Sequence, residues 1–409
     1  MAKKLHMDWL LFSVAAALAI FGVVMVYSAS AMISLQETRN SPSGPSDLAY
    51  VHKQAILTLV GIVLMWIFAR VDYHVLQKKT LVYALVILSI ILLSLVYGFE
   101  PINGARRWIK LAGMSFQPSE LAKLSLPVFL AWYFTEKSPD KFKNLLTPIS
   151  ILAVLSGLIL FEPDLGTTIV LCAIFGFVYF LAGARWLHLV FLLFPIISVF
   201  LILLMISPWR VRRLMAFLSP CSDEHAYDAG YQVCQSLYAI GSGGLLGEGF
   251  AKGQQKLFYL PYPYSDFIFA VVGEELGLLG TTLVVLAFAF LLWRGIRAAM
   301  FAPDKFGNLL ATGIVTGIIT QALFNISVTI SLLPAKGIPL PFISYGGSSI
   351  MVTLISVGVL LSISQHSNVA TMKRKTREKR KLAKSAGLNM RSSSNSGGYS
   401  WRLERRSQG

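Results

Sequence analysis

Charged residues are scarce in this chain of 409 residues: Asp, Glu, Lys and Arg make up only 14% of it, whereas hydrophobic residues make up 55%. The mean hydropathy is +0.64. This balance excludes a soluble globular protein and is typical of a chain that crosses a membrane many times. No barrel-like alternation is present, so the expected spans are helices, which satisfy their own backbone hydrogen bonds in lipid.

Residues that mark metal sites and nucleophiles are also few. The chain has three Cys and six His, and it contains neither an HExxH nor a GxSxG motif. The glycine-dense stretch GSGGLLGEG at 241–249 is not followed by GK[ST], which argues against a nucleotide-binding loop. We therefore expect no dedicated metal site and no nucleic-acid partner. Cys221 and Cys234 would form a disulfide if their compartment is oxidising.

Ten apolar segments predict an all-α polytopic membrane protein with about ten transmembrane helices. They lie at residues 9–30, 51–69, 80–97, 121–134, 148–161, 167–182, 187–206, 267–293, 309–332 and 350–364. The first is too long for a cleavable signal and runs straight into further spans. We expect one transmembrane domain over 1–365, with a large extracytoplasmic loop at 207–265 between the seventh and eighth helices.

The distribution of Lys and Arg predicts that both termini are cytoplasmic. From Gln365 onward the chain holds twelve basic residues against two acidic ones. Because this stretch is also rich in Ser and Gly, residues 366–409 are expected to be a disordered cytoplasmic tail held near anionic membrane lipid.

Basic residues also occur on the predicted outer face, where the positive-inside rule expects few. They are Arg106, Arg107, Lys110, Arg210, Arg212, Arg213, Lys252, Lys256 and Lys336. Their number is too large for topology signals alone, which predicts that they bind an anion.

The stretch at 257–280, LFYLPYPYSDFIFAVVGEELGLLG, holds the main candidate for a catalytic residue. Proline keeps the residue before it extended, so Ser265 or Asp266 is predicted to be the N-cap of the next membrane helix. Asp266 would then lie where water meets lipid. Glu274 and Glu275 follow deeper, and carboxylates at such depth usually face a polar interior. Helix capping alone would also explain Asp266.

Three other outer segments add polar groups to this face. They are NGARRWIKLAGMSFQPSELAKL at 103–124, FEPDLGTT at 161–168 and LLPAKGIPLPFISYGGSS at 332–349. Their candidate substrate-binding residues, besides the cations, are Gln117, Ser119, Glu120, Lys123, Asp164 and Ser344. Asp164 is expected to cap the sixth helix. The last segment has three prolines, so we expect a non-helical loop that lines a cavity.

One carboxylate among several cations suits a sugar carried on a lipid pyrophosphate. Pyrophosphate leaves readily once Arg and Lys neutralise its charge. The remaining task is to deprotonate the attacking sugar hydroxyl, and one carboxylate acting as a general base can do this.

Six segments resemble, in order, the motifs of the SEDS family of shape, elongation, division and sporulation proteins. They are NGARRWI, FQPSELAK, PDLGTT, GYQ..QS..AIGSGG..G.G, QKL.YLP...SDFIFAVVGEELG and KGIPLPFISYGGSS. The resemblance spans residues 9–364 and is nearer to the division branch than to the elongation branch.

The resemblance implies a peptidoglycan glycosyltransferase that polymerises lipid II, a disaccharide peptide on undecaprenyl pyrophosphate. It also implies a class B penicillin-binding transpeptidase and other division proteins as partners, at the septum in the bacterial cytoplasmic membrane. The Asp of the SDF motif, which it implies to be catalytic, is Asp266.

The chain departs from the family pattern beside that Asp. Family members commonly carry an acidic residue after YLP, where this chain has Tyr262, and a small or His residue at the position of Tyr264. A divalent cation between Asp266 and pyrophosphate therefore has less support here. Two alternatives stay open, namely a lipid II flippase and a non-catalytic scaffold that recruits the transpeptidase.

Overall fold

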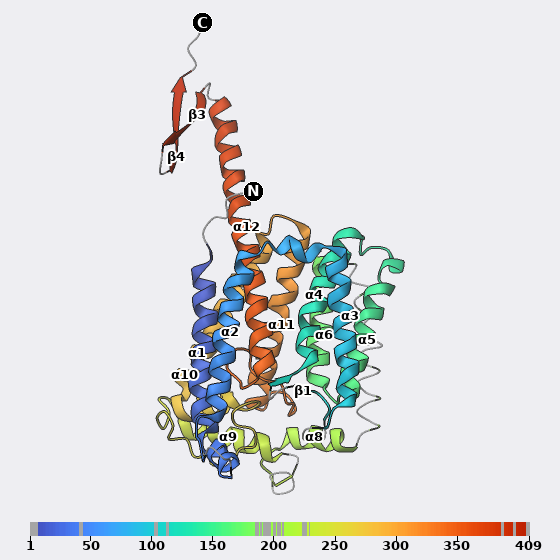
Figure 1. Ribbon diagram of the computed structural model, residues 1–409, viewed down its shortest axis with the longest axis vertical. Helices are drawn as coiled ribbons and strands as arrows, with labels where there is room; N and C mark the ends of the chain where they lie inside the picture. Colours follow the sequence, from blue (N-terminus) through green and yellow to red (C-terminus); the bar gives the residue numbers. More distant parts are fainter. Residues whose placement is uncertain are drawn as a thin grey trace.

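The computed structural model describes residues 7–40, 44–101, 105–111, 114–184, 208–222, 227–228, 230–385, 388–395 and 398–405, and single residues 188, 190, 198, 202 and 206. Most of these residues form helices that stand side by side in one bundle (Figure 1). The bundle helices are α1 (Trp9–Thr38), α2 (Ala49–Arg70), α3 (Lys79–Leu95), α4 (Pro118–Glu136), α5 (Leu146–Phe161), α6 (Leu165–Leu181), α10 (Ile268–Met300), α11 (Lys305–Thr329) and α12 (Gly347–Ser385).

The all-α polytopic membrane fold predicted from the sequence is confirmed. Seven helices in the described part of the chain are long and apolar enough to cross a membrane. Nine of the ten expected segments coincide with bundle helices, whereas the seventh, at 187–206, lies largely outside the described residues. The total of ten spans and the placement of the loop at 207–265 therefore stay predictions.

The interior of the bundle is formed by α11 and α12. In α12, 83% of the most apolar window is buried, whereas the corresponding value for α2 is 22%. Small residues allow close packing here. A Cβ added to Gly313 would lie 2.5 Å from Pro127 Cβ of α4, and one added to Gly295 would lie 2.3 Å from Val315. Such residues let helices approach closely in membranes.

Two short helices lie across one end of the bundle, the lower end in Figure 1. They are α8 (Pro208–Leu218) and α9 (Tyr231–Gly243). A disulfide between Cys221 and Cys234 ties the segment after α8 to α9. The connection from α3 to α4 also holds a hairpin of β1 (Ile109–Leu111) and β2 (Met114–Phe116), which the sequence analysis did not predict.

The glycine-dense stretch after α9 packs against a break in α10. Gly277 interrupts α10 with φ of 63°, a conformation that favours glycine. Backbone N–H groups at 248 and 249 donate to carbonyls at 274 and 275, and those at 278 and 279 donate to carbonyls at 244 and 245. The glycines therefore allow the two backbones to pair closely. The span at 267–293, expected to be one continuous helix, consists of two helical pieces.

Beyond the bundle, α12 continues to Ser385 and is followed by β3 (Leu388–Asn395) and β4 (Gly398–Arg405), which pair antiparallel. Figure 1 shows this extension projecting away from the end where α8 and α9 lie. Residues 366–409 are predicted to be disordered because they are strongly basic and rich in Ser and Gly. The structure describes helix and strand backbone over most of this stretch, and its disorder stays a prediction.

Candidate active site

Asp266 directly precedes α10 without capping it. The helix begins at Ile268, and its N-cap is Phe267, which makes no side-chain cap hydrogen bond. The expectation that Ser265 or Asp266 caps this helix is therefore wrong. The reason is a turn in which the N–H of Phe267 donates to the carbonyl of Tyr262, 3.4 Å away. The partly buried carboxylate of Asp266 is consequently not used by the helix end.

The carboxylate of Asp266 faces the irregular loop between α11 and α12. A Cβ added to Gly337 would lie 2.7 Å from Asp266 Oδ2, so the two residues are in direct contact. Asn325 of α11 fixes this arrangement, because its Nδ2 donates to the carbonyls of Asp266 and Ile338, both at 2.7 Å. As expected, residues 332–346 are non-helical.

Ser344 holds the same loop against the chain before α10. Its Oγ donates to the carbonyl of Ser265 at 2.5 Å and accepts from the N–H of Leu340 at 2.7 Å. Both interactions are with backbone groups, so Ser344 positions the loop beside Asp266 rather than offering an open donor.

Asp164 is the N-cap of α6, as the sequence predicted. Its Oδ1 accepts from the N–H of Thr167 at 3.0 Å and its Oδ2 from the hydroxyl of the same residue at 2.8 Å. Gly166 then lets α6 approach the loop: a Cβ at this position would lie 2.4 Å from the Ile338 side chain. Asp164 is therefore fixed next to the loop that carries Gly337.

Arg107 is the outer cation that acts on Asp266. Burial raises the pKa of Asp266 to about 6, and the negative charge of Asp164 also raises it. The positive charge of Arg107 and a hydrogen bond from Ser265 limit this rise. Below pH 6 the carboxyl is mostly protonated, and above it the carboxylate is available as a base.

The guanidinium of Arg107 is anchored at the α5–α6 turn. Its Nε donates to the carbonyl of Glu162 at 3.0 Å and one terminal nitrogen to that of Pro163 at 2.7 Å. A guanidinium has five N–H donors in a fixed fork. Three donors are therefore not used by these two bonds, which suits recognition of a phosphate group.

Glu162 is a buried acid at this site that the sequence analysis did not select. It is 0% exposed, and neither carboxyl oxygen has a hydrogen-bond partner among the described residues. Burial and the charge of Asp164 raise its pKa to about 8, while Arg107 opposes the rise. Glu162 is therefore mostly protonated at neutral pH. The sequence feature that could have indicated Glu162 is its position two residues before Asp164, which caps α6.

We expect Glu162→Gln to polymerise glycan at close to the wild-type rate at pH 7. Gln matches the size and neutrality of the protonated carboxyl, so it changes little around Arg107. The measurement is a polymerisation rate on purified protein, with Glu136→Gln at the opposite end of the chain's membrane domain as the control. A large loss in Glu162→Gln alone would show that the ionised form, or proton transfer through Glu162, is needed.

Lys123 and Glu120 form a mostly buried pair that reaches the same loop. Their ion pair is 2.8 Å long, and their side chains are 11% and 2% exposed. Lys123 Nζ also donates to Gln321 Oε1 at 2.5 Å, and Gln321 Nε2 donates to the carbonyl of Pro339 at 2.9 Å. The burial favours a polar lining over a solvated surface pair.

Lys256 does not face Asp266 as an open cation. It is 6% exposed and forms a buried ion pair with Glu275, and its Nζ also donates to Ser28 Oγ at 2.7 Å. Glu274 accepts from the N–H groups of Gln254 and Gln255 at 2.6 and 2.9 Å. The two acids thus face a polar interior, as expected, and they anchor the loop before Asp266.

The remaining candidates differ in their exposure and in their contacts. Arg106 is exposed and donates to the carbonyl of Tyr97 at 3.1 Å, and Lys110 is exposed on β1. Gln117 donates its N–H to Ser348 Oγ at 3.1 Å. Ser119 is fully buried, without a described hydrogen-bond partner for its hydroxyl. Lys336 is partly buried and immediately precedes Gly337.

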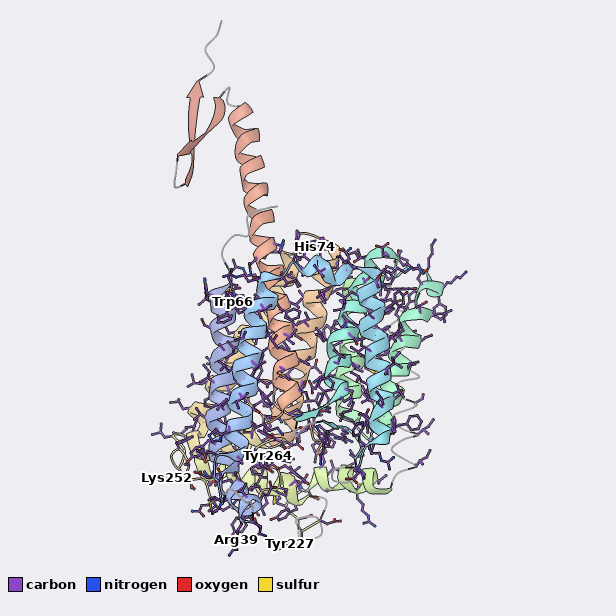
Figure 2. All side chains as sticks on the ribbon, in the orientation of Figure 1. Arg39, Trp66, His74, Tyr227, Lys252 and Tyr264 are labelled. Atoms are coloured by element: carbon purple, nitrogen blue, oxygen red, sulfur yellow. A yellow bond between two sulfur atoms is a disulfide. The ribbon has the colours of Figure 1, made fainter. Side chains whose placement is uncertain are left out.

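Among the other outer cations, Lys252 and Arg212 are exposed, whereas the side chains of Arg210 and Arg213 lie outside what the structure describes. Figure 2 shows Lys252 and Tyr264 at the same end of the bundle. Lys252 therefore lies at the same end as Tyr264, and Arg107 is placed to act on Asp266.

Tyr264, one of the two departures from the family pattern, has a packing role. Its ring lies 4.9 Å from that of Tyr50 and 5.8 Å from that of Tyr345, and its carbonyl accepts from the N–H of Tyr345 at 2.9 Å. Tyr262, the other departure, is 41% exposed. The ring contacts among Tyr50, Tyr264 and Tyr345 connect α2, the segment of Asp266 and the residues just before α12.

Among the described residues, Asp266 belongs to no group of three His, Cys, Asp or Glu with metal-ligand spacing. In the part of the chain that the structure describes, the one group of three His, Cys, Asp or Glu with metal-ligand spacing is Asp72, His74 and His366. Figure 2 shows His74 at the other end of the bundle from Tyr264. Positive charge beside Asp266 is instead supplied by Arg107.

Gly337→Ala is expected to reduce polymerisation strongly, because the new Cβ would push against the Asp266 carboxylate 2.7 Å away. Base geometry tolerates little displacement. The matched control is Gly346→Ala in the same loop, where the nearest atom is the Ser349 Cβ at 3.5 Å, an ordinary contact. Equal rates for both variants and the wild type would contradict this placement of Asp266.

These features define a polytopic membrane protein with an acid and several cations gathered at one end of its helix bundle. The chain belongs to the cell cycle protein family of FtsW, RodA and SpoVE, whose model matches residues 8–369. This confirms the family predicted from the motifs.

Relatives and solved structures match over most of the chain. Stage V sporulation protein E of Bacillus subtilis strain 168 is 39% identical over 369 residues, which cover 89% of this chain and 99% of the relative. A protein of Geobacter sulfurreducens named probable peptidoglycan glycosyltransferase FtsW is 38% identical over 362 residues, covering 87% and 95%.

Among structures, rod shape determining protein RodA of Thermus thermophilus matches with a TM-score of 0.64 and 27% identity, covering 88% of this chain and 97% of RodA. A chain from a structure of a peptidoglycan synthase complex, described as coordinating polymerization and crosslinking, matches with a TM-score of 0.72 and 26% identity. This match covers 89% and 99% of the two chains.

Proposed function

We propose that this protein is a peptidoglycan glycosyltransferase that polymerises lipid II into glycan strands for the septal cell wall. The observation that carries the proposal is a carboxylate, Asp266, that its helix does not use and that lies beside Arg107 and a polar loop. Relatives named as probable peptidoglycan glycosyltransferases support the substrate class.

In the proposed reaction, Asp266 takes the proton from the attacking hydroxyl of one lipid-linked sugar. The hydroxyl oxygen forms a bond to the anomeric carbon of the second substrate. The bond from that carbon to the pyrophosphate breaks, and the electron pair leaves with the lipid pyrophosphate. Arg107, together with Arg106 and Lys336, stabilises the developing charge on this leaving group.

Lys110, Gln117, Ser119, Glu120, Lys123, Asp164 and Ser344 shape the site around this reaction. In the proposal, Lys123 and Glu120 line it, while Asp164 and Ser344 hold its loops through the hydrogen bonds described above. Lys256 keeps a structural role, because its ion pair with Glu275 is buried.

The protein is a membrane protein, and we place it in the bacterial cytoplasmic membrane with both termini inside and Asp266 outside. The Cys221–Cys234 disulfide supports an outer position for α8 and α9, since such bonds persist in oxidising compartments. The basic extension of α12 at the other end supports a cytoplasmic C-terminus.

We further propose that a class B penicillin-binding transpeptidase and other division proteins act with this chain, because a structural neighbour comes from a peptidoglycan synthase complex. The decisive experiment is a lipid II polymerisation assay on the purified protein, with and without its transpeptidase. Glycan chains in either reaction support the proposal, and their absence in both rejects it.

A further inference from the structure

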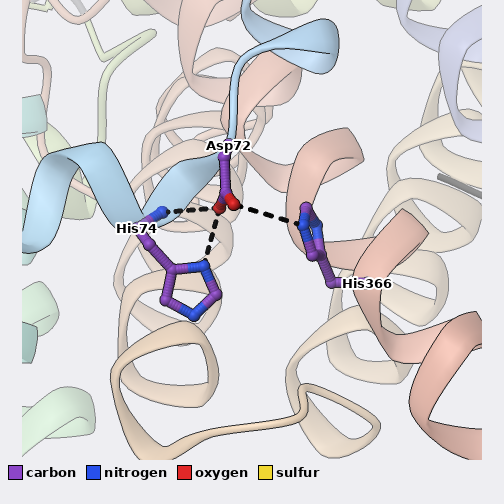
Figure 3. A group of neighbouring side chains, drawn as sticks. All are labelled: Asp72, His74 and His366. Carbon is purple, nitrogen blue, oxygen red and sulfur yellow. Dashed lines mark hydrogen bonds and ion pairs between the residues drawn. The ribbon is translucent and has the colours of Figure 1, made fainter. Parts of the chain in front are cut away.

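A second polar cluster lies at the end of the bundle opposite Asp266, on the predicted cytoplasmic face. Asp72 and His74 belong to the connection between α2 and α3, and His366 lies in α12 just beyond the bundle core. Figure 3 shows the two imidazole rings on either side of the Asp72 carboxylate. Residues nearly 300 positions apart in the sequence thus meet at one point.

The polar atoms of this cluster lie close enough together to reach one small ion. Asp72 Oδ1 lies 2.6 Å from His74 Nδ1, and Asp72 Oδ2 lies 3.6 Å from His366 Nε2. One ligand atom from each residue lies within 4.8 Å of the others. Ligands around a tetrahedral Zn²⁺, bound at about 2.0–2.2 Å, lie roughly 3.3–3.6 Å apart, so small side-chain rotations suffice.

The outer nitrogen of each ring has its own partner, which leaves the inner nitrogen to bind a metal. His366 Nδ1 lies 2.8 Å from the carbonyl of Ser362, so it carries the proton and Nε2 holds the lone pair. His74 Nδ1 is hydrogen-bonded to Asp72, and its Nε2 lies 3.5 Å from Asp304 Oδ1, which can take up the ring proton when Nδ1 binds the metal. Metal-binding histidines usually have such a second partner.

The backbone that carries these ligands is held by hydrogen bonds of α12 to the end of α2. Ser362 Oγ donates to the carbonyl of Val71 at 2.6 Å, and Gln365 Nε2 donates to that of Ala69 at 2.9 Å. Tyr73 is 1% exposed, with its ring centroid 4.1 Å from that of His74. The cluster is therefore fixed by contacts that do not depend on a metal.

We propose that Asp72, His74 and His366 bind one divalent transition-metal ion of the Zn²⁺ class, with water in the remaining position. Two imidazole nitrogens and one carboxylate oxygen select such ions over Mg²⁺ and Ca²⁺, which prefer oxygen ligands. The ion replaces the proton between His74 and Asp72. It joins the α2–α3 connection to the base of the basic α12 extension, and this site is separate from the proposed catalytic function.

The test is a Zn²⁺ titration of the full-length protein, stripped of metal and purified with an affinity tag that contains no histidine. One bound Zn²⁺ per chain is expected, and bound Co²⁺ should show the visible absorption bands of a low-coordinate site with nitrogen ligands. His74→Ala and His366→Gln should each weaken Zn²⁺ binding at least about tenfold.

His52→Ala is the matched control, because His52 is exposed at the other end of α2 and should leave Zn²⁺ binding unchanged. Asp304→Asn, which keeps the ability to cap α11, should weaken binding less than either histidine variant. Wild-type protein that binds no Zn²⁺, or histidine variants that bind it as tightly as wild type, would overturn the proposal. The Co²⁺ spectrum of the wild type tests it even if a variant fails to fold.

Discussion

Asp266→Asn should lower the rate of glycan polymerisation by at least about 100-fold, the usual contribution of a positioned acid or base. The substitution keeps the size and polarity of the side chain but removes its proton acceptor. Since Asp266 does not cap α10, the helix start should not change. The rate is measured on purified protein that is free of other polymerases, with lipid II as substrate.

The control for this variant is Asp228→Asn, an exposed carboxylate in the segment before α9, which should keep the wild-type rate. Lipid II should still bind to Asp266→Asn, and more tightly if the lost negative charge repelled pyrophosphate. Asp266→Glu should recover little activity, because the longer side chain moves the carboxylate towards Gly337. A flippase or a scaffold would not need this base, so normal glycan chains from Asp266→Asn would reject the enzymatic proposal.

The sequence could predict the class of fold because its signals are local. Long apolar segments and the turn motifs around Asp164 and the prolines of 332–349 each depend on neighbouring residues only. These predictions agree with α6, with the non-helical loop and with most of the bundle helices.

Tertiary contacts explain what the sequence could not predict. An Asp before an apolar run is a common N-cap, yet the turn at Tyr262 delays the start of α10 by one residue and leaves Asp266 to the loop. Lys256 was predicted to bind an anion only because the sequence places it on the outer face of the membrane. Its partner Glu275 was visible in the sequence, but their pairing depends on the backbone contacts between the glycine-dense stretch after α9 and α10.

Glu162 is a site residue that the sequence did not indicate, because its role also depends on tertiary contacts. Its burial follows from how the α5–α6 turn packs, and its position two residues before a capping Asp does not by itself distinguish it from a solvated acid at a helix end. Its raised pKa means that the acid beside Arg107 is mostly neutral at pH 7. The charge of Arg107 is therefore not fully balanced by its buried neighbour, and it can act on Asp266 and on a substrate pyrophosphate.

Arg107→Gln should weaken lipid II binding by roughly 10- to 150-fold, which corresponds to about 1.5–3 kcal/mol for a lost charged hydrogen bond. Arg107→Gln should also change the pH dependence of kcat/KM. The positive charge of Arg107 lowers the pKa of Asp266, so its removal should raise that pKa above about 6. Since the base must be ionised, activity is lost as the pH falls through this pKa, and the acid limb of kcat/KM should move to higher pH.

The matched variant is Arg106→Gln, one residue away. Arg106 is exposed and donates to the carbonyl of Tyr97, whereas the charges that shift the pKa of Asp266 are those of Arg107 and Asp164. It should therefore leave the acid limb in place and weaken binding much less, since exposed charges are well screened by water and salt. Identical pH profiles for the two variants would show that the charge of Arg107 does not act on Asp266. A shifted limb in Arg107→Gln alone ties the proton acceptor to the cation that the α5–α6 turn holds beside it.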